Sequence, residues 1–176
     1  PDFASKAGDH TMDEDKFWEF LTEKMQQTPL ERMPLLKGLN YNEAKKILHA
    51  GTMLECKPGD HIVQAGQMGR EMFVLLSGDV EVKAHGSTVA ELSSGAIFGE
   101  AALISEVPRT ANIVAKNDVE VLIVTQETLK KTMATIPEIM VKVMFNLAAI
   151  LSERLQEQTA LVAREDSRPQ TKAPAS

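Results

Sequence analysis

The chain has 176 residues, of which 43% are hydrophobic and 25% charged, enough for one globular domain of ordinary size with flanking segments. Its 25 acidic residues outnumber its 19 basic ones, and the net charge of −6 argues against a nucleic-acid partner, which usually demands a basic face. No apolar run approaches the ~18 residues that span a membrane, and the start lacks the pattern of a signal peptide.

The chain contains a single cysteine, Cys56. One thiol cannot form an internal disulfide, and there is no pair of cysteines at the spacing of metal ligands. A half-buried strand cysteine in a reducing, cytoplasmic setting is the expected interpretation. Because the sequence begins at Pro1 rather than Met, we expect a processed form or a fragment of a longer protein.

The N-terminal part of the sequence predicts a leader and two short helices. Residues 1–10 have no periodicity and are expected to be flexible. Thr11 and Glu14 then form a capping box directly before a group of apolar residues, which predicts an amphipathic helix. Asn40 is placed to cap a second short helix. We therefore assign 11–51 to N-terminal helices.

From Thr52 the sequence changes to short apolar runs separated by turn residues rich in Gly, Pro, Ser and Asp. The runs are residues 53–56, 61–63, 72–76, 80–82, 89–92, 113–114 and 119–124. About eight short strands at this close spacing predict a sandwich, barrel or jelly roll. Residues 52–125 are therefore expected to form a β-roll.

After Thr125 the apolar period returns to that of a helix. Thr125 is placed to cap one short helix, and Pro137 suits the first turn of another, which is expected to run to about residue 161. Its apolar stripe consists of Met140, Met144, Leu147, Leu151 and Leu155. We assign 126–163 to C-terminal lid or interface helices and 164–176 to a disordered tail. The predicted fold class is α+β, an antiparallel, jelly-roll-like double sheet flanked by helices at both ends.

One stretch of the β region, residues 98–111, is not explained by strand formation. It places a glycine and a carboxylate before a short helix-forming patch and then a rigid Pro-Arg pair. Unpaired N–H groups at a helix start, here Ala101 and Ala102, attract an anion such as a sugar phosphate. Gly99 lets the backbone approach without a Cβ, and the guanidinium of Arg109 matches phosphate oxygens.

The carboxylate of Glu100 needs a different partner, because a phosphate would repel it. A ribose hydroxyl, which donates a hydrogen bond, fits this requirement. Each of these features alone is more often an ordinary turn or surface loop. Their occurrence together at fixed spacing predicts a site for a sugar phosphate.

At this point the sequence resembles the cyclic-nucleotide-binding domain family, which includes regulatory subunits of cAMP-dependent kinase, cyclic-nucleotide-gated channels and bacterial catabolite activators. The motif Phe98-Gly99-Glu100 with Ala102-Leu103, followed by Pro108-Arg109-Thr110-Ala111, is similar to the phosphate-binding cassette of that family. Gly59-Asp60, Gly66 and the run from Phe73 to Val80 add support. The resemblance covers roughly 30–155.

The resemblance implies a role for individual residues. The phosphate would be held by Arg109, Ala101, Ala102, Thr110 and Ala111, with the three alanines acting through their backbone N–H groups. The ribose would be held by Gly99 and Glu100. An apolar wall near the base would be formed by Val82, Val89 and Ala90, although inward-facing strand residues are more often plain core. The ligand would be cAMP or cGMP, with no further cofactor and no metal.

Two positions depart from the family pattern. Ala101 stands where the family often has a bulkier leucine, so we expect this cassette to pack more loosely than in members with leucine. Thr110 follows the arginine where many cAMP-binding members have alanine. In that family a hydroxyl here can accept a hydrogen bond from the guanine amino group, which favours cGMP, yet channels with Thr bind both nucleotides. We favour cAMP over cGMP.

The sequence argues against an enzyme. The histidines are dispersed and no nucleophile, base or metal-ligand cluster is apparent. These histidines are His10, His49, His61 and His85. Too few residues follow the last helix for the helix-turn-helix of the catabolite activators. The predicted function is a regulatory sensor domain, and the alternative is an interaction or assembly module that keeps the fold but has lost the ligand.

Transmission of binding is expected to use the helices after Thr125, which would swing to cover the base as the cassette tightens. The apolar stripe of the last helix has two other interpretations, as packed core or as the seam of a homodimer. The effector protein or domain is not identified by the sequence.

Overall fold

The computed structural model describes residues 19, 23, 33–105 and 107–166. The predicted leader 1–10, the helix that Thr11 and Glu14 would open, and tail residues 167–176 lie outside this part of the chain.

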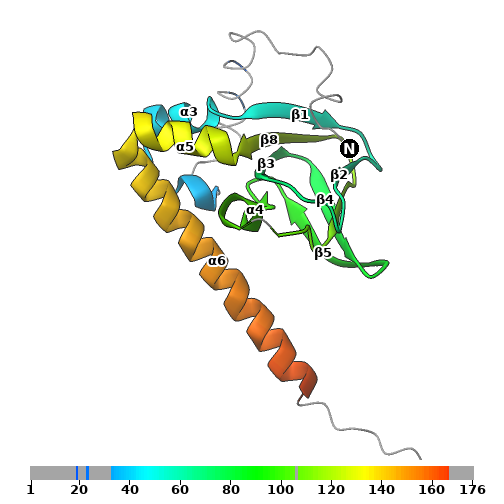
Figure 1. The fold of residues 1–176 in the computed structure, drawn as a ribbon. Helices are drawn as coiled ribbons and strands as arrows, with labels where there is room; N and C mark the ends of the chain where they lie inside the picture. The colour runs from blue at the N-terminus through cyan, green and yellow to red at the C-terminus, as the bar shows by residue number, and fades with distance from the viewer. Residues whose placement is uncertain (1–18, 20–22, 24–32, 106, 167–176) are drawn as a thin grey trace, which may run out of the picture.

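Two four-stranded antiparallel sheets form the body of the molecule (Figure 1). The first sheet has the order β1-β8-β3-β6 and the second has the order β2-β7-β4-β5. The strands are β1 (Thr52–Cys56), β2 (His61–Val63), β3 (Glu71–Ser77), β4 (Asp79–Ala84), β5 (Ser87–Ser93), β6 (Ile97–Phe98), β7 (Asn112–Ala115) and β8 (Val119–Thr125). This arrangement confirms the predicted α+β fold with a jelly-roll-like double sheet.

The tight turn between β4 and β5 shows how local sequence fixes the strands. His85 and Gly86 both have positive φ, of 51° and 81°. Two consecutive residues with positive φ fit the right-handed twist of a hairpin, and the second of them is a glycine, which adopts this conformation without strain. The register then pairs Ala84 with Ser87 and Val82 with Ala90.

The helices before the β-roll are η2 (Pro34–Leu36) and α3 (Tyr41–Leu48). Asn40 caps α3 as predicted: its side chain accepts a hydrogen bond from the backbone N–H of Glu43 at 3.0 Å. The Glu43 carboxylate in turn accepts from the backbone N–H of Asn40 at 2.9 Å, which completes a capping box.

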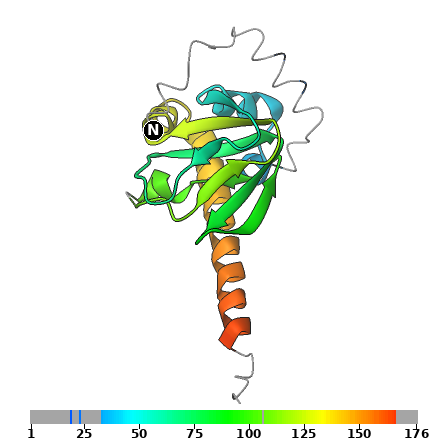
Figure 2. The ribbon, with the colours of Figure 1, turned by 90° about the vertical axis from the view of Figure 1, so that its right-hand side faces the viewer.

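Two helices follow the β-roll, α5 (Gln126–Thr135) and α6 (Pro137–Asp166). Thr125 caps α5 as predicted, accepting from the backbone N–H of Thr128 at 3.1 Å. The last helix continues past its predicted end near 161, and residues 164–166 of the predicted tail are helical, because Ala, Leu, Arg and Glu in this segment are strong helix formers. In Figures 1 and 2 the C-terminal part of α6 extends beyond the β-roll.

Strand β3 is buried on both faces and divides the core in two. Met72, Val74 and Leu76 pack with α3, α4 (Ala101–Ile104) and α6 on the helical side. Phe73 and Leu75 point to the other side and pack between the two sheets. This double burial explains the continuous apolar run of β3, where a half-exposed strand would alternate.

The predicted stripe of α6 is only partly buried. Met140 and Leu147 are 2% exposed and pack with the helical core, together with Val143 and Ile150. Leu155, in contrast, is 65% exposed, so its interpretation as packed core was wrong. Leu155 lies on the solvent side of α6, the face that also carries the exposed Val141 and Phe145, and nothing within the described chain covers its side chain.

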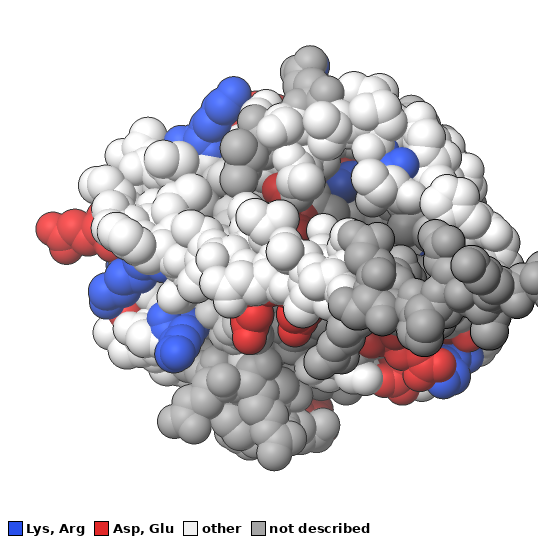
Figure 3. All heavy atoms as spheres, turned by 90° about the horizontal axis from the view of Figure 1, so that it is seen from below, with Lys and Arg blue, Asp and Glu red and all other residues white. Residues whose placement is uncertain are grey.

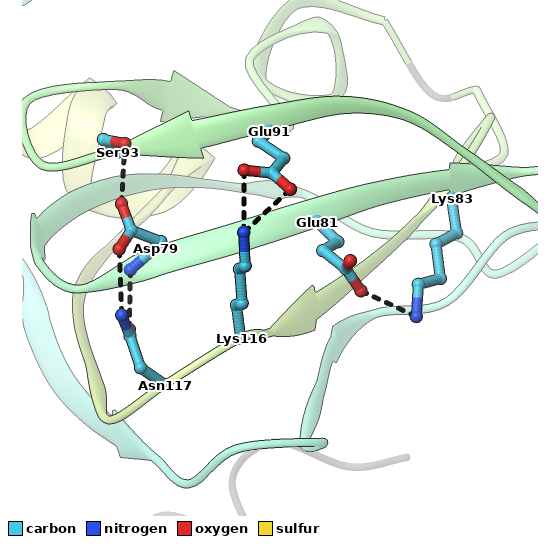
Figure 4. Close-up of polar contacts among 7 residues, drawn as sticks. All are labelled: Asp79, Glu81, Lys83, Glu91, Ser93, Lys116 and Asn117. Carbon is cyan, nitrogen blue, oxygen red and sulfur yellow. Dashed lines mark hydrogen bonds and ion pairs between the residues drawn. The ribbon is translucent and has the colours of Figure 1, made fainter.

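Polar contacts link neighbouring strands on the outer face of the second sheet (Figure 4). Asp79 accepts from the Ser93 hydroxyl at 2.6 Å and from the Asn117 amide at 2.8 Å. The Lys116 ammonium contacts both carboxylate oxygens of Glu91 at 2.8 and 2.9 Å. These contacts join β4, β5 and the β7–β8 turn across the surface.

The contacts of Asp79 predict a dependence of stability on pH. The hydrogen bond from Ser93, and then that from Asn117, holds the pKa of Asp79 below its ordinary value of 3.8. A lowered pKa means stability that is present above the unfolded-state pKa and lost as pH falls through the folded one. We expect Asp79→Asn to lower Tm by about 2–5 °C at pH 7, and this difference to shrink below about pH 4.

Thermal unfolding of both proteins between pH 7 and pH 3 measures this difference. Asp118→Asn is the control, because its ion pair with Lys57 is 71–75% exposed and should contribute little. A difference for Asp79→Asn that stays constant across this range contradicts the assignment.

Candidate functional site

The predicted site residues lie on the segment between β6 and β7, which contains α4. Gly99 follows β6 with φ of +75°, and α4 starts two residues later. At the other end, the backbone of Arg109 is fixed on both sides: its N–H donates to Gln67 at 2.8 Å, and its carbonyl accepts from Gly66 at 2.8 Å. The segment is thus anchored at both ends to the roll.

The side chain of Arg109 points inward and is 7% exposed. Its Nη1 donates to the Gly99 carbonyl at 3.0 Å. Its Nη2 donates to the Glu71 carbonyl at 2.7 Å and to Glu71 Oε1 at 3.0 Å. The guanidinium carbon lies 5.7 Å from the ring centre of Phe73, which stacks on Phe98 at 5.0 Å. These contacts hold the guanidinium of Arg109 against Gly99, at the start of the cassette.

Two glycines form the slot in which Arg109 lies. A Cβ on Gly99 would stand 2.6 Å from Arg109 Nη1, and a Cβ on Gly69 would stand 2.5 Å from Nη2. Gly99 also needs its positive φ, which L side chains rarely adopt. Glycine is required at both positions by the closeness of the arginine, and Gly69 was missed by the sequence analysis.

Glu100 is buried, at 7% exposed. Its Oε1 accepts a hydrogen bond from Arg154 Nη1, and Arg154 Nη2 donates to the Ile97 carbonyl. A buried carboxylate needs such a partner, because an unpaired charge is costly to remove from water. Arg154 of α6 therefore bridges the residues on either side of Phe98 and Gly99.

The start of α4 differs from the prediction in one respect. The N–H of Ala102 is not an unpaired donor, because it donates to the Gly99 carbonyl at 3.1 Å. The reason is that Glu100 already has helical dihedral angles, so the turn closes one residue earlier than expected. Ala101 is exposed at the helix start, Thr110 is exposed, and Ala111 is half-buried beside Arg109.

The three predicted base-contacting residues do not form one continuous wall. Val82 of β4 lies opposite Ala90 of β5, and Val82 packs partly against the inner core. Val89 is the additional residue of a β-bulge and is 61% exposed. A bulge re-aims the side chain, so alternation along β5 could not be read from the sequence.

Glu71 and Arg154 were missed as partners of the predicted site residues. They lie 38 and 54 residues from Arg109 and Glu100, so no local motif connects them. One signal for Arg154 was available: it continues the spacing of the buried positions Val143, Leu147 and Ile150 and is charged where a core residue is expected.

The lower face of the molecule is hollowed, and Figure 3 shows acidic and basic atoms together inside this recess.

Among residues 33–105 and 107–166, together with 19 and 23, no group of three or more His, Cys, Asp or Glu could hold a metal ion. No helix in the same part of the chain is long and apolar enough to cross a membrane.

Comparison with known proteins places this geometry in a family. Residues 53–136 match the model of the cyclic nucleotide-binding domain. The chain is 35% identical over 117 residues to cGMP-dependent protein kinase 2 of Homo sapiens, covering 62% of the chain and 15% of the kinase. It is 32% identical over 123 residues to the cAMP-dependent protein kinase regulatory subunit of Aspergillus niger, covering 69% and 30%.

Among solved structures, the chain is similar to the catabolite activator protein of Thermus thermophilus, with a TM-score of 0.68 and 30% identity. That similarity covers 76% of this chain and 63% of the activator. The matched parts of the chain span less than a third of the length of either kinase-related relative, the cGMP-dependent protein kinase 2 or the cAMP-dependent protein kinase regulatory subunit.

The two sheets, with the segment 98–111 between β6 and β7, define a regulatory domain built on a β-roll. Residues 53–136 belong to the cyclic nucleotide-binding domain family, and this domain is of the type found in kinase regulatory subunits and catabolite activators. The matched region is a regulatory domain.

Proposed function

We propose that this domain is a sensor that binds a cyclic nucleotide, cAMP in preference to cGMP, and transmits binding through its C-terminal helices. The observation that carries the proposal is the fixed position of Arg109 in the slot between Gly69 and Gly99, at the base of the cassette. A guanidinium held in place loses little freedom on binding an anion, which favours a tight phosphate contact.

In this proposal Arg109 contacts the cyclic phosphate, assisted by Thr110 and by the backbone N–H groups of Ala101 and Ala111. The N–H of Ala102 is already bonded to the Gly99 carbonyl, so Ala102 would contribute only by holding the first turn of α4 in position. Glu100 accepts the ribose 2′-OH beside Gly99. A carboxylate has two oxygens, so Glu100 can keep Arg154 on Oε1 and still accept a hydroxyl.

The base would lie against the β4–β5 hairpin, where Val82 and Ala90 face each other. Val89, at the bulge, would contribute only from its exposed position. Relatives of both kinds match the chain, the cAMP-dependent regulatory subunit at 32% identity and the cGMP-dependent kinase at 35%, so the proposed preference for cAMP is tested by titration with both nucleotides. The exposed Thr110 would moderate this preference.

Transmission is supported by the contact between Arg154 and Glu100, because it joins α6 to the residue that would bind the ribose. Any change in the position of Glu100 on binding would displace Arg154, because the two side chains form an ion pair. By linkage, a ligand that strengthens this ion pair is itself bound more tightly when α6 is in place. The effector would be a separate domain or protein in a reducing, cytoplasmic setting.

The first test is calorimetric titration of nucleotide-stripped protein with cAMP and with cGMP. Arg109→Ala should remove two or three charge-assisted hydrogen bonds and weaken binding by about 3–5 kcal/mol, roughly several hundred-fold to several thousand-fold. Lys131→Ala, which breaks only the exposed pair with Glu127, is the control and should bind normally. Thermal unfolding of each variant shows whether the fold is kept.

Micromolar or tighter binding by the wild-type protein supports the sensor, and the ratio of the two affinities tests the preference. Unchanged affinity in Arg109→Ala refutes the assigned role. No heat with either nucleotide supports the alternative, an interaction module that retains the cassette only as structure.

A second prediction concerns Arg154. Arg154→Met keeps the aliphatic stem but leaves Glu100 without its cation, so nucleotide binding should no longer slow hydrogen exchange in α6. Lys142→Met is a matched control, because it removes another cation of α6, which pairs with Glu43 at 2.8 Å away from the cassette. Nucleotide-dependent exchange in α6 that is the same in wild type and Arg154→Met argues against transmission through this contact.

A homodimer through α6 is supported by a second stripe, on the solvent side of the helix, which is apolar except for Ser152 and Thr159. Its members follow one another at alternating spacings of four and three, as in a coiled coil, and all are exposed. They are Val141, Phe145, Ala148, Ser152, Leu155, Thr159 and Val162. Phe145 is 74% exposed and Leu155 65%, which is unusual for large apolar side chains on a monomer.

We therefore expect light scattering after size exclusion to give the mass of a dimer for the wild type and of a monomer for the double variant Phe145→Ser with Leu155→Ser. Val89→Ser on β5, another large apolar side chain that is 61% exposed but does not lie on α6, is the control and should stay dimeric. A monomeric wild type at about 100 μM, well above the dissociation constant of a stable dimer, overturns this part of the proposal.

A further inference from the structure

The cation of the cassette already has an anionic partner inside the protein. Oε1 of Glu71 lies 3.0 Å from Arg109 Nη2. Its other oxygen, Oε2, accepts from the backbone N–H of Arg70 at 2.7 Å. The Glu71 side chain, at the first residue of β3, is 24% exposed, whereas that of Arg109 is 7% exposed. The carboxylate thus meets the arginine from the solvent side of the pair.

A carboxylate and a phosphate are recognised by a guanidinium in the same way, through parallel N–H donors on a planar fork. Two anions beside one cation repel each other, and this repulsion is weakly screened near the protein interior. A cyclic phosphate that approaches Arg109 must therefore displace the Glu71 carboxylate or bind against its charge.

The position of Arg109 does not depend on that carboxylate. The carbonyls of Gly99 and Glu71 accept two of its hydrogen bonds, and these are backbone atoms that stay in any variant of residue 71. The slot between Gly69 and Gly99 confines the guanidinium further. Removal of the charge at Glu71 should leave the arginine in place with more of its positive charge available.

We propose that Glu71 is an internal competitor for the anion site, which lowers the affinity of the domain for a cyclic phosphate. This inference rests on the proposed contact between Arg109 and the phosphate. In the nucleotide-free protein Glu71 neutralises the buried arginine. When the phosphate binds, the carboxylate turns from Nη2 into the surface pocket lined by Met68, Gly69 and Arg70, where water solvates it.

The role differs from that of a buttress, which would hold Arg109 toward the ligand and so strengthen binding. The two roles predict opposite signs for the same substitution. Glu71 sets how much nucleotide is needed to occupy the site, through the free energy of displacing one carboxylate from one guanidinium.

The test is calorimetry of Glu71→Gln with cAMP. The amide can still accept a hydrogen bond from Arg109 through its oxygen but carries no charge, so we expect binding roughly 3- to 30-fold tighter than in wild type. A neutral triester of the cyclic phosphate provides a second measurement, because the gain should be absent when the ligand has no charge. Glu55→Gln, an exposed residue of β1, makes the same change in net charge and should alter neither affinity.

Equal or weaker binding of cAMP by Glu71→Gln overturns the competitor role, and so does an equal gain for the neutral triester. Should Glu71→Gln fail to fold, Glu71→Asp shortens the side chain by one methylene and should tighten binding in the same direction by a smaller factor. If the wild type and all variants fail to bind cAMP, the proposed function itself is wrong, which is a different result from binding without a gain.

Discussion

The positive charge of Arg109 lies inside the protein, and much of the site is arranged around it. Removing a guanidinium from water is unfavourable unless its donors are satisfied, so the chain supplies two backbone carbonyls, one carboxylate and an aromatic face. Each of these comes from β3 or from the residue that follows β6. The pairing of those strands, Phe73 with Phe98 and Val74 with Ile97, is what brings them together.

Glu100 places the opposite charge in the same region, and its partner comes from the far end of the chain. Two buried ions of opposite sign lie near one another, each held by a partner of its own: Glu71 for Arg109 and Arg154 for Glu100. In the proposed binding mode, a ligand with one negative charge and a hydroxyl group would contact Arg109 of the first pair and Glu100 of the second. The affinity of the domain is thus a difference between two sets of interactions, those made with the ligand and those exchanged for it.

Features set by neighbouring residues could be predicted from the sequence. The caps at Asn40 and Thr125 depend on residues three positions apart, and the β-roll follows from short apolar runs between turn residues. The cassette was also visible, because its residues are contiguous. Its partners Glu71 and Arg154 were not, since they approach only when β3 and α6 are packed against it.

Two other features have physical causes that the sequence does not show. The bulge at Val89 shifts the alternation of β5, and no residue type marks it in the sequence. Leu155 follows Leu147 and Leu151 at steps of four, and each such step turns about 40° around a helix of 3.6 residues per turn. The predicted stripe therefore drifts from the buried face of α6 to the exposed one, which periodicity alone does not reveal.

The length of α6 has a mechanical consequence. At 1.5 Å per residue, its 30 residues make a rod about 45 Å long that begins at Pro137, beside the β-roll. A tilt of about 10° around that end would move the far tip by about 8 Å, by the geometry of the same rod. Arg154, which contacts Glu100, lies about 26 Å along the rod from Pro137, so a shift of Arg154 reaches the far tip enlarged roughly 1.7-fold. A movement at the cassette is therefore carried by α6 to a point well outside the β-roll, where a second protein can contact the helix.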